Sequence, residues 1–287
     1  MTAVDWRTRK RTLTNRDHTL IMGVVNVTPD SFSDGGRYFE NTEAIAHGRR
    51  LAALGADVID VGGESTRPGA PPIPASEEIS RITPVIEALA ADGIAVSADT
   101  SKAEVAAAAL AAGAEIVNDV SALSDPDMAA VIAGSGAGVV LMHMQQKPAT
   151  MQQNPYYDNV TAEVFEALIQ RAEMAEAAGI DRSCICIDPG IGFGKTLDHN
   201  LELLRDLRVF TSTPYPVVLG TSRKSFLGTL AGLSDPEERD AATAGTTALA
   251  VAAGVFCVRV HDVPANLQSA RVADAIVRPR SFDEGVG

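Results

Sequence analysis

The sequence predicts a single-domain (β/α)8 TIM barrel, on three observations. The chain has 287 residues, which is long for one ordinary domain but normal for this fold. Eight short apolar runs alternate with Ala-rich helical stretches, a succession typical of parallel sheets. The runs are apolar on both faces, as strands covered by helices on both sides must be. A doubly wound open sheet is the alternative that these observations leave open.

The predicted strands are rich in Val, Ile, Leu and Ala. In chain order they are LIMGVVNV (20–27), ADVIDVGG (56–63), IAVSADT (94–100), AEIVNDV (114–120), AGVVLMH (137–143), CICIDPG (184–190), YPVVLGTS (215–222) and FCVRVHD (256–262). Helical patterns between them include TEAIAHGRRLAALG (42–55), SEEISRITPVIEALAADG (76–93) and KAEVAAAALAAG (102–113). Each of these three ends in Gly, the residue that most often terminates a helix.

The two ends of the chain are predicted to lie outside the barrel. We expect the barrel to span residues 19–279, with an N-terminal extension of residues 1–18 and a C-terminal tail of residues 280–287. The extension contains the basic cluster RTRKR and no apolar signal sequence, so we expect a mobile, solvated segment. The longest irregular stretch covers about residues 144–157, and loops of that length are usually functional or disordered.

Composition excludes several classes of function. The net charge of −13 disfavours binding to nucleic acid and to anionic membranes. A single Trp and four Tyr argue against a surface that stacks on bases, and no apolar run is long enough to span a membrane. Cys184, Cys186 and Cys257 lie inside predicted strands, which indicates free, buried thiols and a cytoplasmic location.

Polar residues stand at or just after the end of every predicted strand. In chain order they are Asn26, Asp60, Glu64, Asp99, Asn118, Asp119, His143, Asp188, Ser222, Arg223, Lys224, Arg259 and His261. Any one of them could cap the next helix. Together they meet at the C-terminal rim, the end of the barrel where the strands finish and where barrel enzymes carry their chemistry. Because buried acids and amides are costly unless they are partnered or used, the joint pattern favours an active site.

The last two strands carry cations. Arg259 and His261 are two residues apart in a strand, so their side chains point the same way, which suits a phosphate or diphosphate. An ion pair with a neighbouring acid is the alternative. In GTSRKSFLG (220–228), Lys224 lies past the apolar run, which fits non-covalent binding better than a Schiff base. IDPGIGFGKT (187–196) lacks the spacing of a nucleotide-binding P-loop.

The acids and the amide at the rim suit a flat nitrogen heterocycle. Asp99, Asp188 and Asn118 offer donor and acceptor edges that could orient such a ring. The cations would then hold a charged leaving group. The residues by themselves therefore predict a barrel enzyme that binds a polar heterocycle beside an anionic group.

The motifs as a set resemble one family. In chain order they are MGVVNVTPDSFSDGG, VGGESTRPGA, DTSKAEV, NDVSAL, LMHMQ, DPGIGFGKT, TSRKSFLG and VRVHDV. Together they resemble the bacterial dihydropteroate synthases, which are pterin-binding enzymes, over about residues 19–276. The resemblance implies a reaction of folate biosynthesis. A dihydropterin with a 6-hydroxymethyl diphosphate group condenses with p-aminobenzoate, and 7,8-dihydropteroate and diphosphate result.

The resemblance also implies a role for each matching residue. It makes Asp99, Asp188 and Lys224 catalytic, and it makes Asn26 the contact to a Mg²⁺ ion on the diphosphate. The implied pterin pocket comprises Asp99, Asn118, Met142, Asp188, Phe193, Gly220 and Lys224. The implied diphosphate contacts are Asn26, Arg67, Arg259 and His261. The implied p-aminobenzoate site comprises Phe32, Asp34, Thr66, Arg67, Pro68, Lys224 and Ser225.

Three further expectations follow from the resemblance. The first loop, VNVTPDSFSDGG (25–36), should fold over the bound diphosphate and complete the p-aminobenzoate site, which is also the site of sulfonamide action. The family implies a homodimer. A dissociative reaction path is favoured over in-line attack, although the sequence does not decide between them. The rival functions are a pterin-binding methyltransferase and a non-catalytic pterin-binding paralogue.

Overall fold

Eight parallel strands form the centre of the molecule. The computed structural model describes residues 4–28, 37–66, 69–146 and 150–278. The strands are β3 (Leu20–Asn26), β4 (Val58–Gly62), β5 (Val96–Asp99), β6 (Ile116–Asp119), β7 (Gly138–Met142), β8 (Ile185–Asp188), β9 (Val218–Leu219) and β10 (Cys257–Val260). Their order in the sheet is β8-β7-β6-β5-β4-β3-β10-β9, and a parallel bridge between Ile187 and Val217 brings the two ends together. The barrel is therefore confirmed, and the open-sheet alternative is wrong.

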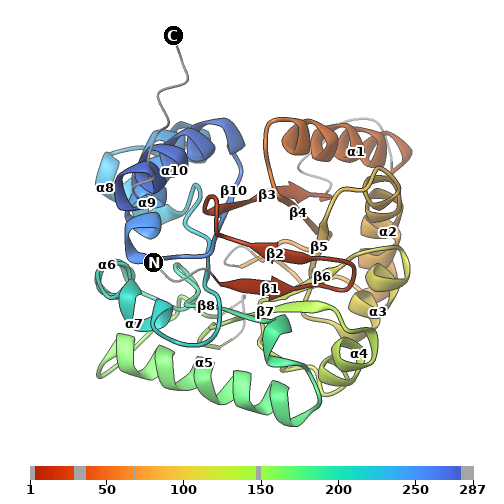
Figure 1. Cartoon of the computed structure of the whole chain (residues 1–287), viewed down its shortest axis with the longest axis horizontal. Helices are drawn as coiled ribbons and strands as arrows, with labels where there is room; N and C mark the ends of the chain where they lie inside the picture. Colours follow the sequence, from red (N-terminus) through yellow and green to blue (C-terminus); the bar gives the residue numbers. More distant parts are fainter. Residues whose placement is uncertain (1–3, 29–36, 67–68, 147–149, 279–287) are drawn as a thin grey trace.

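Helices surround these strands on all sides (Figure 1). The α-helices are α1 (Arg37–Ala53), α2 (Ala75–Ala91), α3 (Ala103–Ala111), α4 (Met128–Ser135), α5 (Val160–Ala177), α6 (Leu197–Arg205), α7 (Leu207–Thr211), α8 (Ser225–Ala231), α9 (Asp240–Ala253) and α10 (Val263–Val277). Short 3-10 helices are η2 (Arg182–Cys184) and η3 (Pro236–Arg239). Within the described residues, no helix combines the length and the apolar character needed to cross a membrane.

Glycine ends the helices that the sequence predicted to end in it. Gly113 follows α3 with φ +114°, a conformation that L side chains rarely adopt. A Cβ atom at this position would also lie 2.8 Å from the Cβ of Ala90 in the neighbouring helix. The chain can therefore turn from α3 into β6 only because this residue has no side chain.

Two apolar layers hold the barrel together. The larger one lies between the strands and the helices and includes Ile59, Ile86 and Val139. The smaller one takes residues from the strands on the opposite face, among them Met22, Val140 and Cys186, and so fills the interior of the barrel. Trp6 belongs to this inner layer. The three cysteines are free and buried, as the sequence predicts.

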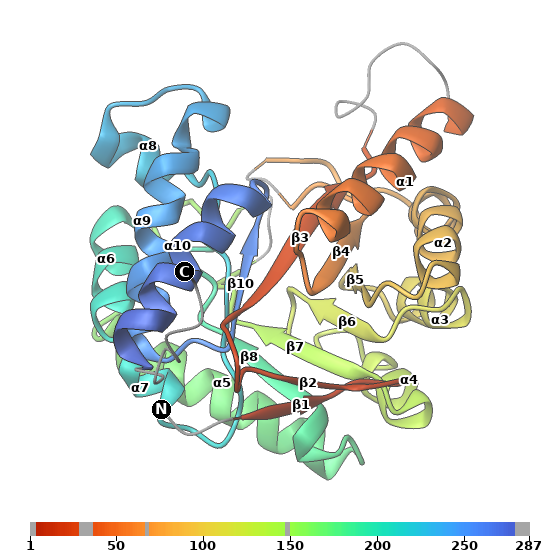
Figure 2. The ribbon, with the colours of Figure 1, turned by 45° about the horizontal axis from the view of Figure 1, so that its top comes forward.

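The N-terminal extension is not the mobile tail that we expected. Residues Asp5–Arg7 (β1) and Thr12–Thr14 (β2) form an antiparallel hairpin that lies across the N-terminal end of the barrel (Figures 1 and 2). Trp6 is fully buried, and its Nε1 donates a hydrogen bond of 2.8 Å to the carbonyl of Cys184. The ring of Trp6 also meets Phe256 edge-on at 6.2 Å. The hairpin is therefore part of the barrel fold.

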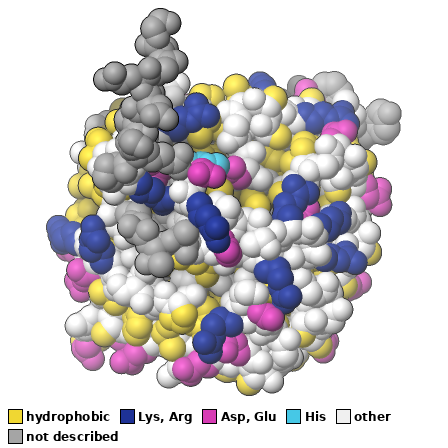
Figure 3. Space-filling model, viewed as in Figure 1, with side chains coloured by type: hydrophobic (Ala, Val, Ile, Leu, Met, Phe, Trp, Pro, Cys, Tyr) yellow, Lys and Arg dark blue, Asp and Glu magenta, His cyan; other side chains and the backbone are white. Residues whose placement is uncertain are grey.

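The basic residues of the RTRKR cluster have partners on the barrel. Arg11 donates to both carboxylate oxygens of Glu115, at 2.7 and 3.0 Å, and the side chain of Glu115 is almost completely buried. Arg9 donates to the carbonyl of Leu110 at 2.5 Å. Cationic and anionic side chains are interspersed over the face drawn in Figure 3. The cluster RTRKR thus fastens the hairpin to the protein's own surface.

Trp6→Ala is expected to lower the free energy of unfolding by about 3–5 kcal/mol, the usual cost of removing a large buried aromatic ring. The variant also leaves the Cys184 carbonyl without its indole donor. Urea denaturation measures the change. Arg49→Ala is the control, since its ion pair with Asp92 is half-exposed and should contribute little to the free energy of unfolding. Equal, small losses in both variants would show that the hairpin does not close the barrel.

Candidate active site

Two acids and one arginine meet at the C-terminal rim. Arg259 on β10 donates from Nε to Asp60 on β4 and from Nη2 to Asp99 on β5, each at 2.6 Å. Asp60 is fully buried, and Asp99 is only 8% exposed. The sequence favoured a phosphate contact for Arg259 over an ion pair with a rim acid. The structure shows the ion pair, which links strands on either side of β3, and the phosphate contact stays a prediction.

Asp60 also orients Asn118. The Nδ2 group of Asn118 donates to Oδ2 of Asp60 at 3.1 Å, so one buried carboxylate oxygen serves both Asn118 and Arg259. The Oδ1 atoms of Asp60 and Asp99 are buried and have no hydrogen-bond partner among the described residues. Burial raises the pKa of Asp99 to about 7, against the opposing effect of Arg259. The rim thus holds acceptor atoms that a ligand could satisfy.

Asp188 and Lys224 form the second half of the rim. Oδ1 of Asp188 accepts a hydrogen bond from the Gly190 amide at 2.7 Å. Lys224 donates from Nζ to the Ile191 carbonyl, and the same Nζ lies 4.6 Å from the centre of the Phe193 ring. Burial raises the pKa of Asp188 and lowers that of Lys224 to about 8, and each charge partly offsets the other's shift.

The structure brings the predicted pterin residues together. A Cβ atom on Gly220 would lie 3.9 Å from Nζ of Lys224 and 3.8 Å from Cβ of Arg259, so Gly220 lies between these two cations. Met142 on β7 pairs in register with Asp188 on β8, and Asp99 on β5 pairs with Asn118 on β6. One end of the barrel therefore carries carboxylates, an amide, an ammonium group and an aromatic ring.

The predicted diphosphate contacts are only partly described. Asn26 is half-buried at the end of β3, beside Gly62 on β4. Nδ1 of His261 lies 2.9 Å from Oγ of Ser222, and the same hydroxyl accepts from the His261 amide at 3.1 Å. Ser222, which follows β9, thereby orients the ring of His261. Arg67 lies outside the described residues.

The predicted p-aminobenzoate site lies largely outside the described residues. Phe32, Asp34 and Pro68, like Arg67, belong to the segments that the structure does not describe, as does most of the first loop. Thr66 is half-buried after β4, and Ser225 is exposed as the first residue of α8. The closing motion predicted for the first loop stays a prediction.

Sequence reasoning missed three features of the rim. Asp60 was recognised only as one polar strand end, but it joins Asn118 to Arg259. Arg223, expected beside Lys224 in the site, instead pairs with Asp240 of α9 through two bonds of 2.8 Å. Lys195 is almost completely buried beneath the glycine-rich loop. The signal for Lys195 was present, since a lysine stands directly after the run GIGFG.

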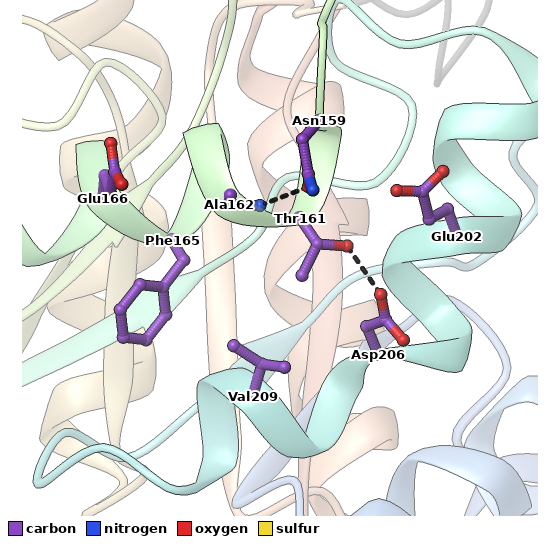
Figure 4. Close-up of a pocket in the computed structure, with 8 residues that line it drawn as sticks. All are labelled: Asn159, Thr161, Ala162, Phe165, Glu166, Glu202, Asp206 and Val209. Carbon is purple, nitrogen blue, oxygen red and sulfur yellow. Dashed lines mark hydrogen bonds between the residues drawn. The ribbon is translucent and has the colours of Figure 1, made fainter.

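A separate groove of about 400 Å³ lies on the outside of the barrel, between α5 and the segment of α6 and α7 (Figure 4). Thr161 donates to Asp206 at 2.9 Å, and Asn159 accepts from the Ala162 amide at 2.9 Å. None of the residues that line this groove stands at a strand end. The groove is therefore distinct from the rim.

Comparison with known proteins identifies the family. The model of the "Pterin binding enzyme" family matches residues 22–261. The dihydropteroate synthase of Mycobacterium leprae is 48% identical over 262 residues, which cover 89% of this chain and 92% of that protein. A probable bifunctional folylpolyglutamate synthase/dihydropteroate synthase of Haloferax volcanii is 45% identical, and the match covers 93% of this chain but 32% of that longer protein.

Solved structures agree with the sequence comparison. Dihydropteroate synthase of Xanthomonas albilineans with 4-aminobenzoic acid has a TM-score of 0.90 and 46% identity, and covers 96% of this chain and 98% of its own. The same enzyme in complex with 7,8-dihydropteroate has a TM-score of 0.86 and 43% identity over 95% and 98% of the two chains. With the motifs, the barrel and the rim in place, the chain belongs to the pterin-binding enzymes, among the dihydropteroate synthases.

Proposed function

We propose that this protein condenses 6-hydroxymethyl-7,8-dihydropterin diphosphate with p-aminobenzoate to form 7,8-dihydropteroate and diphosphate. The observation that carries the proposal is the convergence of Asp99, Asn118, Asp188 and Lys224 at one end of the barrel, in a chain of this family. The ligands of the Xanthomonas albilineans structures support the same product and the same amine substrate.

The charges at the rim suit the bond changes. The aromatic amine forms a bond to the pterin methylene carbon, the C–O bond to diphosphate breaks, and the amine loses a proton. Positive charge develops on the methylene and the ring, where Asp99 and Asp188 stabilise it. Negative charge develops on the diphosphate, where Arg259 and His261 receive it. This distribution favours a dissociative path, and positional isotope exchange in the diphosphate without p-aminobenzoate tests it.

A Mg²⁺ ion fits this site as a companion of the diphosphate. Among the described residues no group of three or more His, Cys, Asp and Glu side chains could hold a metal. Asn26 offers an amide oxygen at the end of β3, and Mg²⁺ in nucleotide-type sites commonly takes one or two protein ligands together with phosphate oxygens and water. Asn26 would hold the ion, which would neutralise charge on the leaving group.

Incubation of the protein with the dihydropterin diphosphate, p-aminobenzoate and Mg²⁺ tests the function. We expect release of diphosphate and formation of 7,8-dihydropteroate, both lost when Mg²⁺ is removed by a chelator. A sulfonamide should compete with p-aminobenzoate in the same assay. If neither product forms, a non-catalytic pterin-binding protein or a pterin-binding methyltransferase becomes the better account, and methyl transfer from a methylated tetrahydrofolate separates those two.

We propose that the protein is a homodimer that associates through its last helices. Leu249 on α9 is 66% exposed, and Val272 and Ile276 on α10 are 63% and 74% exposed. The two helices lie side by side on the outer surface in both ribbon views (Figures 1 and 2). Exposed apolar side chains gathered on neighbouring helices favour an interface. Light scattering should give about twice the chain mass of 30.0 kDa; a mass of one chain would refute the dimer.

A further inference from the structure

The glycine-rich loop after β8 is held by side chains, three from outside it and one, Lys195, from its own C-terminal end. Successive carbonyls of Ile191, Gly192, Phe193 and Gly194 each accept a hydrogen bond from a side chain. The donors, in the same order, are Lys224 Nζ, Gln152 Nε2 at 2.7 Å, Lys195 Nζ at 3.0 Å and Tyr157 OH at 3.0 Å. In a helix or a sheet, carbonyls accept hydrogen bonds from backbone amides. Here their positions depend on particular side chains.

Lys195 is the most deeply buried of these donors. Its side chain is 3% exposed, and Nζ lies 3.0 Å from Nδ1 of His143, 3.0 Å from the Phe193 carbonyl and 3.4 Å from the His143 carbonyl. Burial lowers the pKa of Lys195 to about 7. In its charged form the ammonium group has three protons to donate, and these three acceptors can satisfy it. Burial and the nearby Lys195 charge lower the pKa of His143 to about 3, so the ring is neutral and its Nδ1 can accept. The lysine thus joins the end of β7 to the loop after β8.

The loop that Lys195 holds is in contact with two residues of the pterin pocket. The Gly190 amide donates to Asp188 at 2.7 Å. The ring of Phe193 lies 4.6 Å from Nζ of Lys224, and a Cβ atom on Gly192 would lie 3.1 Å from Cδ of Lys224. A shift of the loop would therefore move the hydrogen bond to Asp188 and the surroundings of Lys224 together.

We propose that Lys195 is a positioning residue for the pterin site: it holds the glycine-rich loop, through the Phe193 carbonyl and His143, against Asp188 and Lys224. The inference rests on the proposed function, because it concerns the substrate of that same site. Lys195 is almost completely buried, so it is not available for a contact at the protein surface. Its effect is expected on the pterin half of the reaction.

Lys195→Met tests this inference, since methionine keeps an unbranched side chain and removes the three donors. We expect the affinity for 6-hydroxymethyl-7,8-dihydropterin, measured by calorimetry, to fall about tenfold, as loss of a buried hydrogen-bonding group commonly costs. The KM for the dihydropterin diphosphate should rise by a similar factor, and the KM for p-aminobenzoate should stay within about twofold of the parent.

Arg11→Met is the matched control. It also removes a cation that donates to a buried partner, Glu115, but at the opposite end of the barrel. It should lower the melting temperature and leave both KM values and the pterin affinity unchanged. If Lys195→Met lowers only the melting temperature in the same way, Lys195 is structural and the inference is overturned.

A second variant and the calorimetric binding measurement keep the test decisive. If Lys195→Met does not fold, Lys195→Gln replaces it under the same criterion, because its amide can still donate to one carbonyl. Calorimetry with the dihydropterin does not depend on turnover. A parent protein that binds this pterin but forms no dihydropteroate would therefore refute the proposed function and leave the role of Lys195 to be decided by binding.

Discussion

Lys224→Ala is expected to lower kcat/KM for the dihydropterin diphosphate by about 100- to 1,000-fold, close to loss of turnover. Removal of one preorganised donor from an active site commonly has this effect. Lys224 donates to the Ile191 carbonyl, lies over the Phe193 ring and opposes the raised pKa of Asp188. Without it, Asp188 becomes harder to ionise, and the pocket loses one of its two cations and part of its negative charge. Initial rates with each substrate varied in turn measure the change.

A control variant and a double-mutant cycle make this prediction specific. Lys10→Ala removes an exposed lysine whose Nζ donates to the Gly113 carbonyl, far from the rim, and should leave the rate unchanged. Asp188→Ala should lower the rate about as much as Lys224→Ala, and the double variant should lose much less than the product of the two effects, because the two groups act as a unit. Near-normal rates in either single variant would show that the pterin pocket lies elsewhere.

Arg259→Met is expected to lower the free energy of unfolding by about 3–5 kcal/mol at pH 8, the usual cost of leaving buried charge without its partner. Asp60 and Asp99 would then share a buried space with no cation between them. The loss should be smaller at pH 6. The pKa of Asp99 is already raised to about 7 and would rise further, so at pH 6 the folded protein holds the acid in its neutral form. Urea denaturation at both pH values measures this.

Arg182→Met provides the comparison for Arg259. Arg182 also forms two bonds of 2.8 Å to one carboxylate, that of Glu176, but its side chain is 61% exposed. Its removal should cost much less than removal of Arg259 and show little dependence on pH between 6 and 8. Equal costs for the two arginines would mean that burial does not govern the rim network.

The strands were predictable because their pattern is local. IAVSADT, expected as a strand over residues 94–100, contains β5, although only Val96–Asp99 pair with their neighbours. The runs at 20–27 and 256–262 likewise contain β3 and β10. Each prediction was longer than the strand, because apolar residues continue into turns where the backbone no longer pairs. The rim acids followed from the same pattern, since a parallel barrel brings all strand ends to one side.

The N-terminal hairpin was not predictable from local pattern. RTRKR has the composition of a solvated tail, and a single Trp in its vicinity carries no periodicity. Its structure depends on partners far along the chain, such as the Cys184 carbonyl for Trp6 and the Glu115 carboxylate for Arg11. The burial of Trp6 becomes favourable only when the barrel interior exists to receive the ring.

The amino-acid sequence by itself determined the barrel, the end of the barrel that carries the chemistry, and the family. Those conclusions depend on periodicity and on motifs, which short segments contain in full. The tertiary structure decided which polar groups are partners. Arg259 meets Asp60, 199 residues away, because β10 and β4 flank β3, and Lys195 meets His143 because β7 and β8 are neighbours. Such pairs form only when the ring of strands closes, so no stretch of sequence contains them.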